Sequence, residues 1–158
     1  LEKYSRRNCI LTGMPEESGE DVMEKTLNLF NNVMKMIPPV ALHEIDRLHR
    51  VGRKSENGHD RQRKIIVKFS TYRSRRRVFD HRRTLFNRQQ PAADAVYINE
   101  DLTRDRTALL FNARKLKKDN RLLDVWTSDG TFLIKDKSKN IKVARTLPDI
   151  KKLLASFT

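Results

Sequence analysis

The sequence predicts an α+β protein made of two consecutive units. Two observations support this prediction. Short apolar or β-branched runs, bounded by glycine and proline, alternate with segments whose apolar residues recur at helical spacing. After residue 100 the pattern changes to a helix, a hairpin and a second helix. The 158 residues are enough for one medium domain or two small ones.

The first unit begins with a strand that is followed by a helix. Residues 9–12 form a short apolar run that ends at Gly13-Met14-Pro15, which is typical of a strand. Residues 18–21 read as a capping box with acidic residues for a first helical turn. An apolar stripe with spacings of four, three, four and three residues follows, namely Met23, Leu27, Phe30, Met34 and Ile37. We expect the helix to bury this stripe and to stop at Pro38-Pro39.

Three more strands and one helix complete the first unit. We expect strands over residues 43–51, 65–69 and 96–98, and a long polar loop over 52–62. We expect a helix over 72–85 whose inner face carries Val78, Arg82 and Leu85. The resulting order, β-α-β-β-α-β, is the split βαβ pattern of ferredoxin-like domains.

The second unit is predicted to be a small α/β arrangement of helix, β-hairpin and helix. Thr103 can cap the first helix, whose Leu109, Ala113 and Leu116 share a face. Strands over 122–127 and 131–135 flank an Asp-Gly pair, a strong hairpin signal, and residues 141–144 are expected to add a strand. A second capping box at 146–149 opens the last helix.

The positive charge of the chain is concentrated in residues 50–90. This segment holds 14 of the 34 Lys and Arg residues and only three acids, so it carries +11 of the net +14. Eleven of its cations are arginines, which bind phosphate in a bidentate manner and stack on bases. A field this dense in a foldable chain predicts a polyanion-binding surface. The alternative is a solvated charged face, although such a face normally mixes both signs.

The composition excludes several other classes of function. The longest apolar runs have about four residues, far below a membrane span. The single cysteine, Cys9, permits neither an internal disulfide framework nor a cysteine-based zinc site, and it favours a reducing compartment. The four histidines lack metal-ligand spacing, so neither a metal nor a cofactor is expected. Asp101 and Asp105 suit a helix N-terminus better than a nuclease site, so we do not expect an enzyme.

Four motifs occur in a characteristic order, at residues 7–16 (RNCILTGMPE), 49–53 (HRVGR), 63–69 (RKIIVKF) and 99–103 (NEDLT). In this order they resemble the RNA-binding first-open-reading-frame protein of LINE-type (non-LTR) retrotransposons. The resemblance covers roughly residues 4–157. It implies an RRM over residues 8–99, a C-terminal nucleic-acid-binding domain over 100–158, and an upstream coiled coil that trimerises the protein. Residues 1–7 would be the end of that coiled coil or a linker, and because the chain starts with Leu1 we expect it to be an excised fragment.

The resemblance also implies a function. We expect binding of single-stranded RNA, and of DNA, with low sequence specificity, in a retrotransposon ribonucleoprotein particle of the cytoplasm or nucleus. Nucleic-acid chaperone activity is implied in the same way. Two alternatives stay open: a host-adopted RNA-binding or protein-interaction module of the same fold, and a basic module for proteins or anionic membranes. The membrane alternative is disfavoured because no basic amphipathic helix turns a bulky apolar face outward.

The expected contacts with nucleic acid are mostly arginines. The full set is Arg6, Arg7, Arg50, Arg53, Arg61, Arg63, Lys64, Lys68, Arg73, Arg76, Arg77, Arg104, Arg106, Arg114 and Trp126. For Trp126 both a core position and a base-stacking position stay open.

The usual base-stacking positions of an RRM lack aromatic residues in this chain. They fall on Ile10, Lys64 and Ile66, whereas an RRM normally places aromatics there. Tyr97 is expected to be buried or half-buried. Phosphate contacts should therefore carry most of the binding and convey little sequence information.

Overall fold

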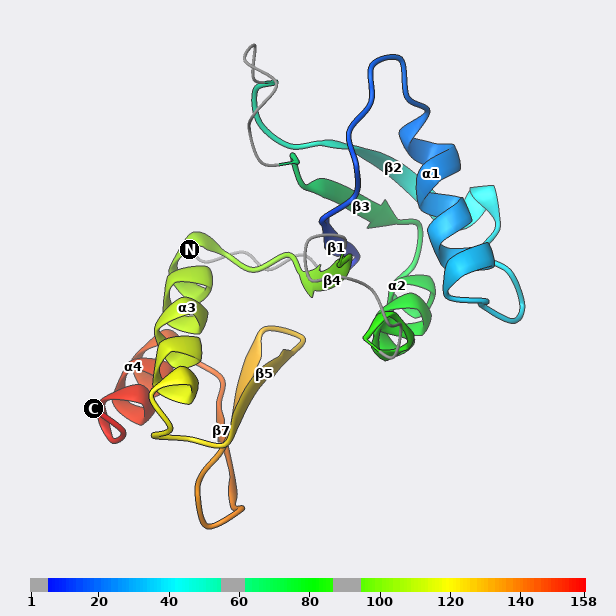
Figure 1. Cartoon of the computed structure of the whole chain (residues 1–158). Coiled ribbons are helices and arrows are strands. Elements are labelled where there is room, and N and C mark those ends of the chain that lie inside the picture. The colour runs from blue at the N-terminus through cyan, green and yellow to red at the C-terminus, as the bar shows by residue number, and fades with distance from the viewer. Residues whose placement is uncertain (1–5, 55–61, 87–94) are drawn as a thin grey trace. The chain divides into compact units, whose positions relative to one another are not determined.

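The computed structural model describes residues 6–54, 62–86 and 95–158 as an α+β protein with two antiparallel sheets (Figure 1). The chain divides into two compact units, one of residues Arg6–Asp101 and one that includes Leu102–Thr158. The division lies two residues beyond the expected boundary at residue 99. No helix in the described part of the chain is long and apolar enough to cross a bilayer.

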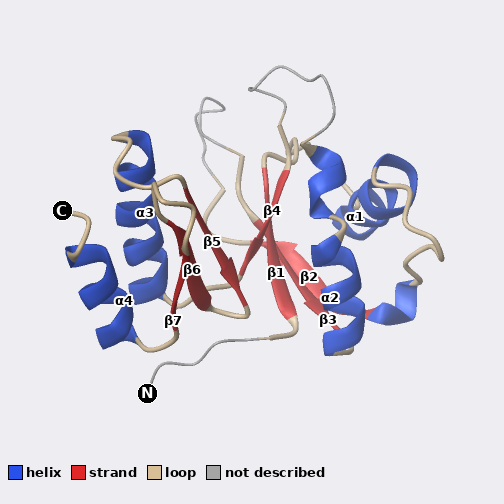
Figure 2. Cartoon of the chain, turned by 90° about the horizontal axis from the view of Figure 1, so that it is seen from below, coloured by secondary structure: helices blue, strands red, loops and turns tan. Residues whose placement is uncertain are grey.

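The first unit is a four-stranded antiparallel sheet with its helices packed on one face (Figure 2). Its strands are β1 (Asn8–Thr12), β2 (Ile45–Arg50), β3 (Ile65–Phe69) and β4 (Tyr97–Glu100), in the spatial order β2-β3-β1-β4. Its helices are α1 (Val22–Asn28) and α2 (Tyr72–Asp80). A π-helical turn, Leu29–Val33, extends α1, and 3-10 turns occupy Leu42–Glu44 and Arg82–Leu85.

Strict alternation along the two central strands places the core of the first unit on the helical face. In β3, Ile65, Val67 and Phe69 are fully buried while the residues between them are half-buried. Phe30 from the turn after α1 and Val78 from α2 pack against this face. Because successive side chains of a strand point to opposite faces, the residues between these buried ones lie on the face of the sheet away from the helices.

The predicted helix over residues 18–37 is shorter than expected. Its N-cap is Asp21, whose carboxylate accepts a hydrogen bond from the Glu24 N–H at 3.0 Å. The helical turns end at Val33 with Met34 as the C-cap, because Lys35 adopts a left-handed backbone conformation with φ 53°. The chain therefore leaves the helix before Ile37, the last residue of the predicted apolar stripe. Met36 enters the core, and Ile37, which was predicted to be buried, is 87 % exposed.

The second unit has a three-stranded antiparallel meander covered by two helices. The helices are α3 (Arg104–Lys118) and α4 (Leu147–Ala155), and the strands are β5 (Asp124–Ser128), β6 (Thr131–Lys135) and β7 (Ile141–Ala144), in the order β5-β6-β7. Its separate core is built from Ala113, Phe132, Ile134 and Ile150, among others. Thr103 and Thr146 cap the two helices, as the sequence predicts.

Candidate nucleic-acid interface

The described cations fall into two groups, those engaged inside the fold and those exposed to solvent. Arg50 belongs to the first group, because its side chain is only 4 % exposed. Its register opposite Ile65 turns it to the helical face, where Nε donates to Glu20 Oε1 at 2.8 Å. It also donates to the carbonyl oxygens of Met14 and Pro15 at 2.9 and 2.7 Å. The structure therefore places Arg50 inside the fold, whereas the predicted phosphate contact needs an exposed guanidinium.

The Arg50 network has an electrostatic consequence for its acidic partner. The Arg50 hydrogen bond, with a further contribution from Lys25, lowers the pKa of Glu20 to about 2 although burial opposes this shift. Glu20 Oε2 lies 2.9 Å from Lys25 Nζ, so one carboxylate joins the loop before α1 to the end of β2. This cluster stabilises the fold, and all three guanidinium nitrogens of Arg50 donate to partners within it.

Arg63 and Arg77 are also held by internal acids. Arg63 forms an ion pair with Glu16 and donates to the Gly52 carbonyl at 2.9 Å, and its hydrogen bond lowers the pKa of Glu16. Arg77 Nη2 lies 3.1 Å from Glu44 Oε1, and Nη1 donates to the Pro38 carbonyl. Both side chains keep about a quarter of their surface exposed. A phosphate would have to compete with these carboxylates.

One arginine, Arg75, is buried although it was not among the predicted core residues. Arg75 on α2 has no exposed surface, and its Nη2 lies 3.4 Å from Glu100 Oε1, which is equally buried. Its guanidinium stands 4.5 Å from the centre of the Phe79 ring. The predicted inner stripe of α2, which begins at Val78, reaches Arg75 when it is extended back by three residues, so helical periodicity carried a signal for this position. A second signal was Glu100 at the inner position of a buried strand, because a buried carboxylate is stabilised by a paired cation.

Nine described cations of the first unit are exposed, and we call this set the basic shell. They are Arg6, Arg7, Lys35, Arg47, Arg53, Lys54, Lys64, Arg73 and Arg83. Five of these were predicted as contacts, whereas Lys35, Arg47, Lys54 and Arg83 were not. Lys68 and Arg76 are partly exposed beside Asp46 and Asp80, at 3.5 and 3.2 Å. Arg61 lies outside the described residues.

The sheet face opposite the helices carries polar and aliphatic side chains from all four strands. The paired residues His49, Ile66, Ile10 and Asn99 form one row across the sheet. Arg47, Lys68 and Asn8 form the next row. The predicted stacking positions Ile10 and Ile66 therefore lie side by side at the centre of this face. Their half-exposed aliphatic side chains offer apolar contact without an aromatic ring.

In the second unit the predicted contacts separate in the same way. Arg104 and Arg114 are exposed on α3. Arg106 instead donates to the carbonyl oxygens of Gly130 and Arg145, the latter at 2.8 Å, and so ties α3 to the hairpin and to the end of β7. Trp126 pairs with Leu133 and is half-buried, and its neighbour Val125 is the residue that enters the core. By alternation Trp126 lies on the sheet face away from that core.

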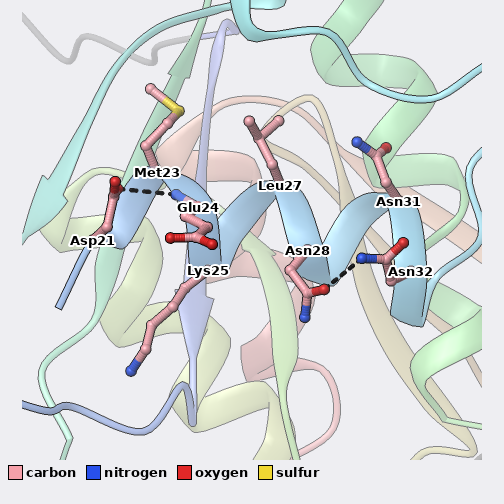
Figure 3. Close-up of a pocket in the computed structure, with 8 residues that line it drawn as sticks. All are labelled: Asp21, Met23, Glu24, Lys25, Leu27, Asn28, Asn31 and Asn32. Carbon is pink, nitrogen blue, oxygen red and sulfur yellow. Dashed lines mark hydrogen bonds between the residues drawn. The ribbon is translucent and has the colours of Figure 1, made fainter.

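A shallow open depression of about 750 Å³ runs along α1 and the turn that follows it. Figure 3 shows its lining, which includes the carboxylates of Asp21 and Glu24, the amides of three asparagines and the apolar Met23 and Leu27. Its one cation, Lys25, is paired with Glu17 and Glu20. The lining of the depression thus has more acidic than basic side chains, so it does not suit a polyanion and is not part of the basic shell.

Two further chemistries find little support in the described residues. Burial raises the pKa of the Cys9 thiol to about 12, which keeps it from acting as a nucleophile. Within residues 6–54, 62–86 and 95–158, no three His, Cys, Asp or Glu side chains are grouped so that they could hold a metal ion.

Comparison with known proteins adds no assignment. The chain matches no protein-family model, and a search of curated proteins finds no significant match.

Proposed function

We propose that this chain binds single-stranded RNA, and DNA, with low sequence specificity, as part of a retrotransposon ribonucleoprotein particle in the cytoplasm or nucleus. The proposed activity is binding and remodelling of strands, as a nucleic-acid chaperone, without a chemical step. Trimerisation through an upstream coiled coil would place several such modules on one strand. The family part of this proposal rests on the four ordered motifs at residues 7–16, 49–53, 63–69 and 99–103.

We further propose that the first unit is a ferredoxin-like domain of the RRM type. Its strand order β2-β3-β1-β4, with every neighbouring pair antiparallel, supports this assignment. So does the placement of α1 between β1 and β2, and of α2 between β3 and β4. In such a domain the sheet face opposite the helices is the usual platform for RNA.

The single observation that carries the proposed function is the basic shell. After the arginines with internal ion pairs are set aside, nine exposed cations remain on the described part of the first unit. They come from the chain before β1, from the turn after the π-helical segment, from β2 and the chain after it, from the residue before β3 and from α2 and its 3-10 extension. A surface of this kind neutralises phosphates and conveys little sequence information.

Salt-dependent binding tests the proposal. Fluorescence anisotropy with a labelled single-stranded oligouridylate, titrated at several salt concentrations, should give a log–log slope of about −3 to −4 if about four to six phosphates are neutralised. Double-stranded DNA of the same length serves as the competitor. A slope near zero would contradict the electrostatic mechanism and favour a protein-interaction module of the same fold.

A further inference from the structure

Two aromatic side chains stand together and exposed at the β4 edge of the first unit. Tyr97 begins β4, and Phe86 follows the 3-10 turn after α2. Their ring centroids are 5.8 Å apart with an interplanar angle of 42°. Tyr97 is 43 % exposed, although its sequence position predicts a buried or half-buried ring, and Phe86 is 54 % exposed.

Strand register places the Tyr97 ring on the open face of the sheet. Tyr97 pairs with Thr12, while its neighbour Ile98 pairs with Leu11 and is buried in the core. Because side chains alternate along a strand, Tyr97 points to the face that the helices leave open. Phe86 comes from the helical layer and meets Tyr97 at the edge of the sheet, where their contact restricts the orientation of both rings.

A cation of the basic shell lies within reach of this aromatic pair. Lys64 precedes β3 by one residue, and it lies one step beyond the pairing of Ile65 with Leu11. It therefore lies next to Thr12 of β1, which in turn pairs with Tyr97 of β4, and two strand spacings put β3 and β4 about 10 Å apart. It is exposed, and by the alternation of side chains along the strand it lies on the open face together with Ile66 and Lys68. One single-stranded nucleic acid could therefore place a phosphate at Lys64 and a neighbouring base at Tyr97.

We propose that Tyr97 and Phe86 form a base-stacking site on β4, which takes the place of the aromatics absent from Ile10, Lys64 and Ile66. This inference rests on the proposed single-strand binding and adds a site to it. Exposed rings of this size are costly in water, whereas stacking on a base buries them. Since every base has a π-face, such a site raises affinity without selecting a sequence.

The test compares an ordinary strand with one that has no bases. Fluorescein-labelled oligothymidylate and a tetrahydrofuran abasic oligonucleotide, each of about 16 nucleotides, are titrated by anisotropy at constant salt. Tyr97→Leu should weaken binding to oligothymidylate about tenfold and change abasic binding by less than about twofold. Phe86→Leu should weaken oligothymidylate binding by a smaller factor. Tyr97→Phe keeps the ring and should bind as the native chain does.

Tyr72→Leu is the matched control, because Tyr72 is 40 % exposed but lies at the start of α2 in the helical layer. It should leave binding to both oligonucleotides unchanged. Equal losses on both oligonucleotides for Tyr97→Leu, or no loss on oligothymidylate, would overturn the stacking site while leaving the charge-based function intact. Absence of binding by the native chain would overturn both proposals.

A photocrosslink on the native chain covers the case in which a variant does not fold. Iodouridine-substituted RNA should crosslink to Tyr97 or Phe86 when irradiated in the complex, as mapped by peptide mass spectrometry. Crosslinks that avoid both residues would overturn the assignment.

Discussion

Arg53 and Arg77 have the same predicted role, but their surroundings in the structure differ. Arg53 is exposed in the segment after β2, whereas Arg77 is paired with Glu44 and donates to the Pro38 carbonyl. Both belong to the +11 segment, so net charge does not distinguish them. What separates them is whether an acid from another element lies opposite the guanidinium.

Charge reversal should therefore change different properties at these two positions, RNA binding at Arg53 and stability at Arg77. Arg53→Glu should weaken RNA binding and reduce the salt slope by about 0.7, the value of one phosphate on a single strand, while changing stability by less than about 0.5 kcal/mol. Arg77→Glu should lower the free energy of unfolding by about 2 kcal/mol, because Glu44 loses its partner and gains a like charge. Anisotropy and urea unfolding measure the two effects. Native binding and an unchanged melting curve for Arg53→Glu would remove this arginine from the interface.

Glu20 makes stability dependent on pH in a defined window. Its pKa in the folded protein, about 2, lies below the ordinary value of 4.5, chiefly because Arg50 donates to it. A depressed pKa stabilises the fold fully above pH 4.5, and this contribution is lost as pH falls toward 2. We expect a loss of at most about 3 kcal/mol over that range in urea unfolding.

Two variants assign this pH dependence to the Glu20 cluster. Glu20→Gln should be less stable than the native chain at neutral pH and should show a flatter stability curve in the acid range. Arg50→Met should flatten the curve as well, because the cation that lowers the pKa of Glu20 is gone. Parallel curves for the native chain and Glu20→Gln would show that other carboxylates dominate acid unfolding.

At the scale of elements, the hairpin of the second unit follows directly from local chemistry. Asp129 and Gly130 both have positive φ, at 51° and 77°, which is the conformation of a type I′ turn. The Asp-Gly pair predicts this turn because it tolerates that conformation, and β5 and β6 pair on either side of it, from Ser128–Thr131 outward. Local propensity and the observed register agree here without help from distant residues.

Two glycine exchanges in the second unit should therefore change stability in opposite directions. Gly130→Ala adds a Cβ at a left-handed position and should cost about 1 to 2 kcal/mol. Lys139 has φ 67° in the exposed turn before β7, so Lys139→Gly should stabilise by a few tenths of a kcal/mol to about 1 kcal/mol. Thermal unfolding of both variants measures these changes. A stabilising Gly130→Ala would contradict the observed turn conformation.

The positions at which the helices end were harder to predict. The apolar stripe of α1 correctly predicts Phe30 and Met34 as core residues, because helical periodicity reports burial. The same stripe wrongly includes Ile37. The helix ends before it at the left-handed Lys35, and a lysine, unlike a glycine or an asparagine, does not predict that conformation. Likewise α2 was expected to end at Leu85 but ends at Asp80, and a 3-10 turn occupies Arg82–Leu85.

At the scale of the whole molecule, the proposed function predicts that both units bind nucleic acid, since both carry exposed cations, and that their linkage strengthens binding. Each unit has its own hydrophobic core, so residues 1–101 should fold when expressed alone. The linked chain should bind an oligouridylate of about 20 nucleotides more tightly than this piece, because the second unit acts at a high effective concentration. If the piece binds as tightly as the whole chain, Arg104 and Arg114 have no part in binding.

The sequence by itself determined the α+β class, the order of the elements, the Thr103 and Thr146 caps and the hairpin turn. All of these depend on residues near one another in the chain, where propensity, periodicity and turn chemistry act. The concentration of charge in residues 50–90 was visible at the same level. Only the tertiary structure decided which of those cations are exposed, because Glu16, Glu20, Glu44 and Glu100 reach their arginines across 25 to 47 residues of chain. It also brought Phe86 to Tyr97, since the meeting of a 3-10 turn with an edge strand depends on how the helical layer packs on the sheet.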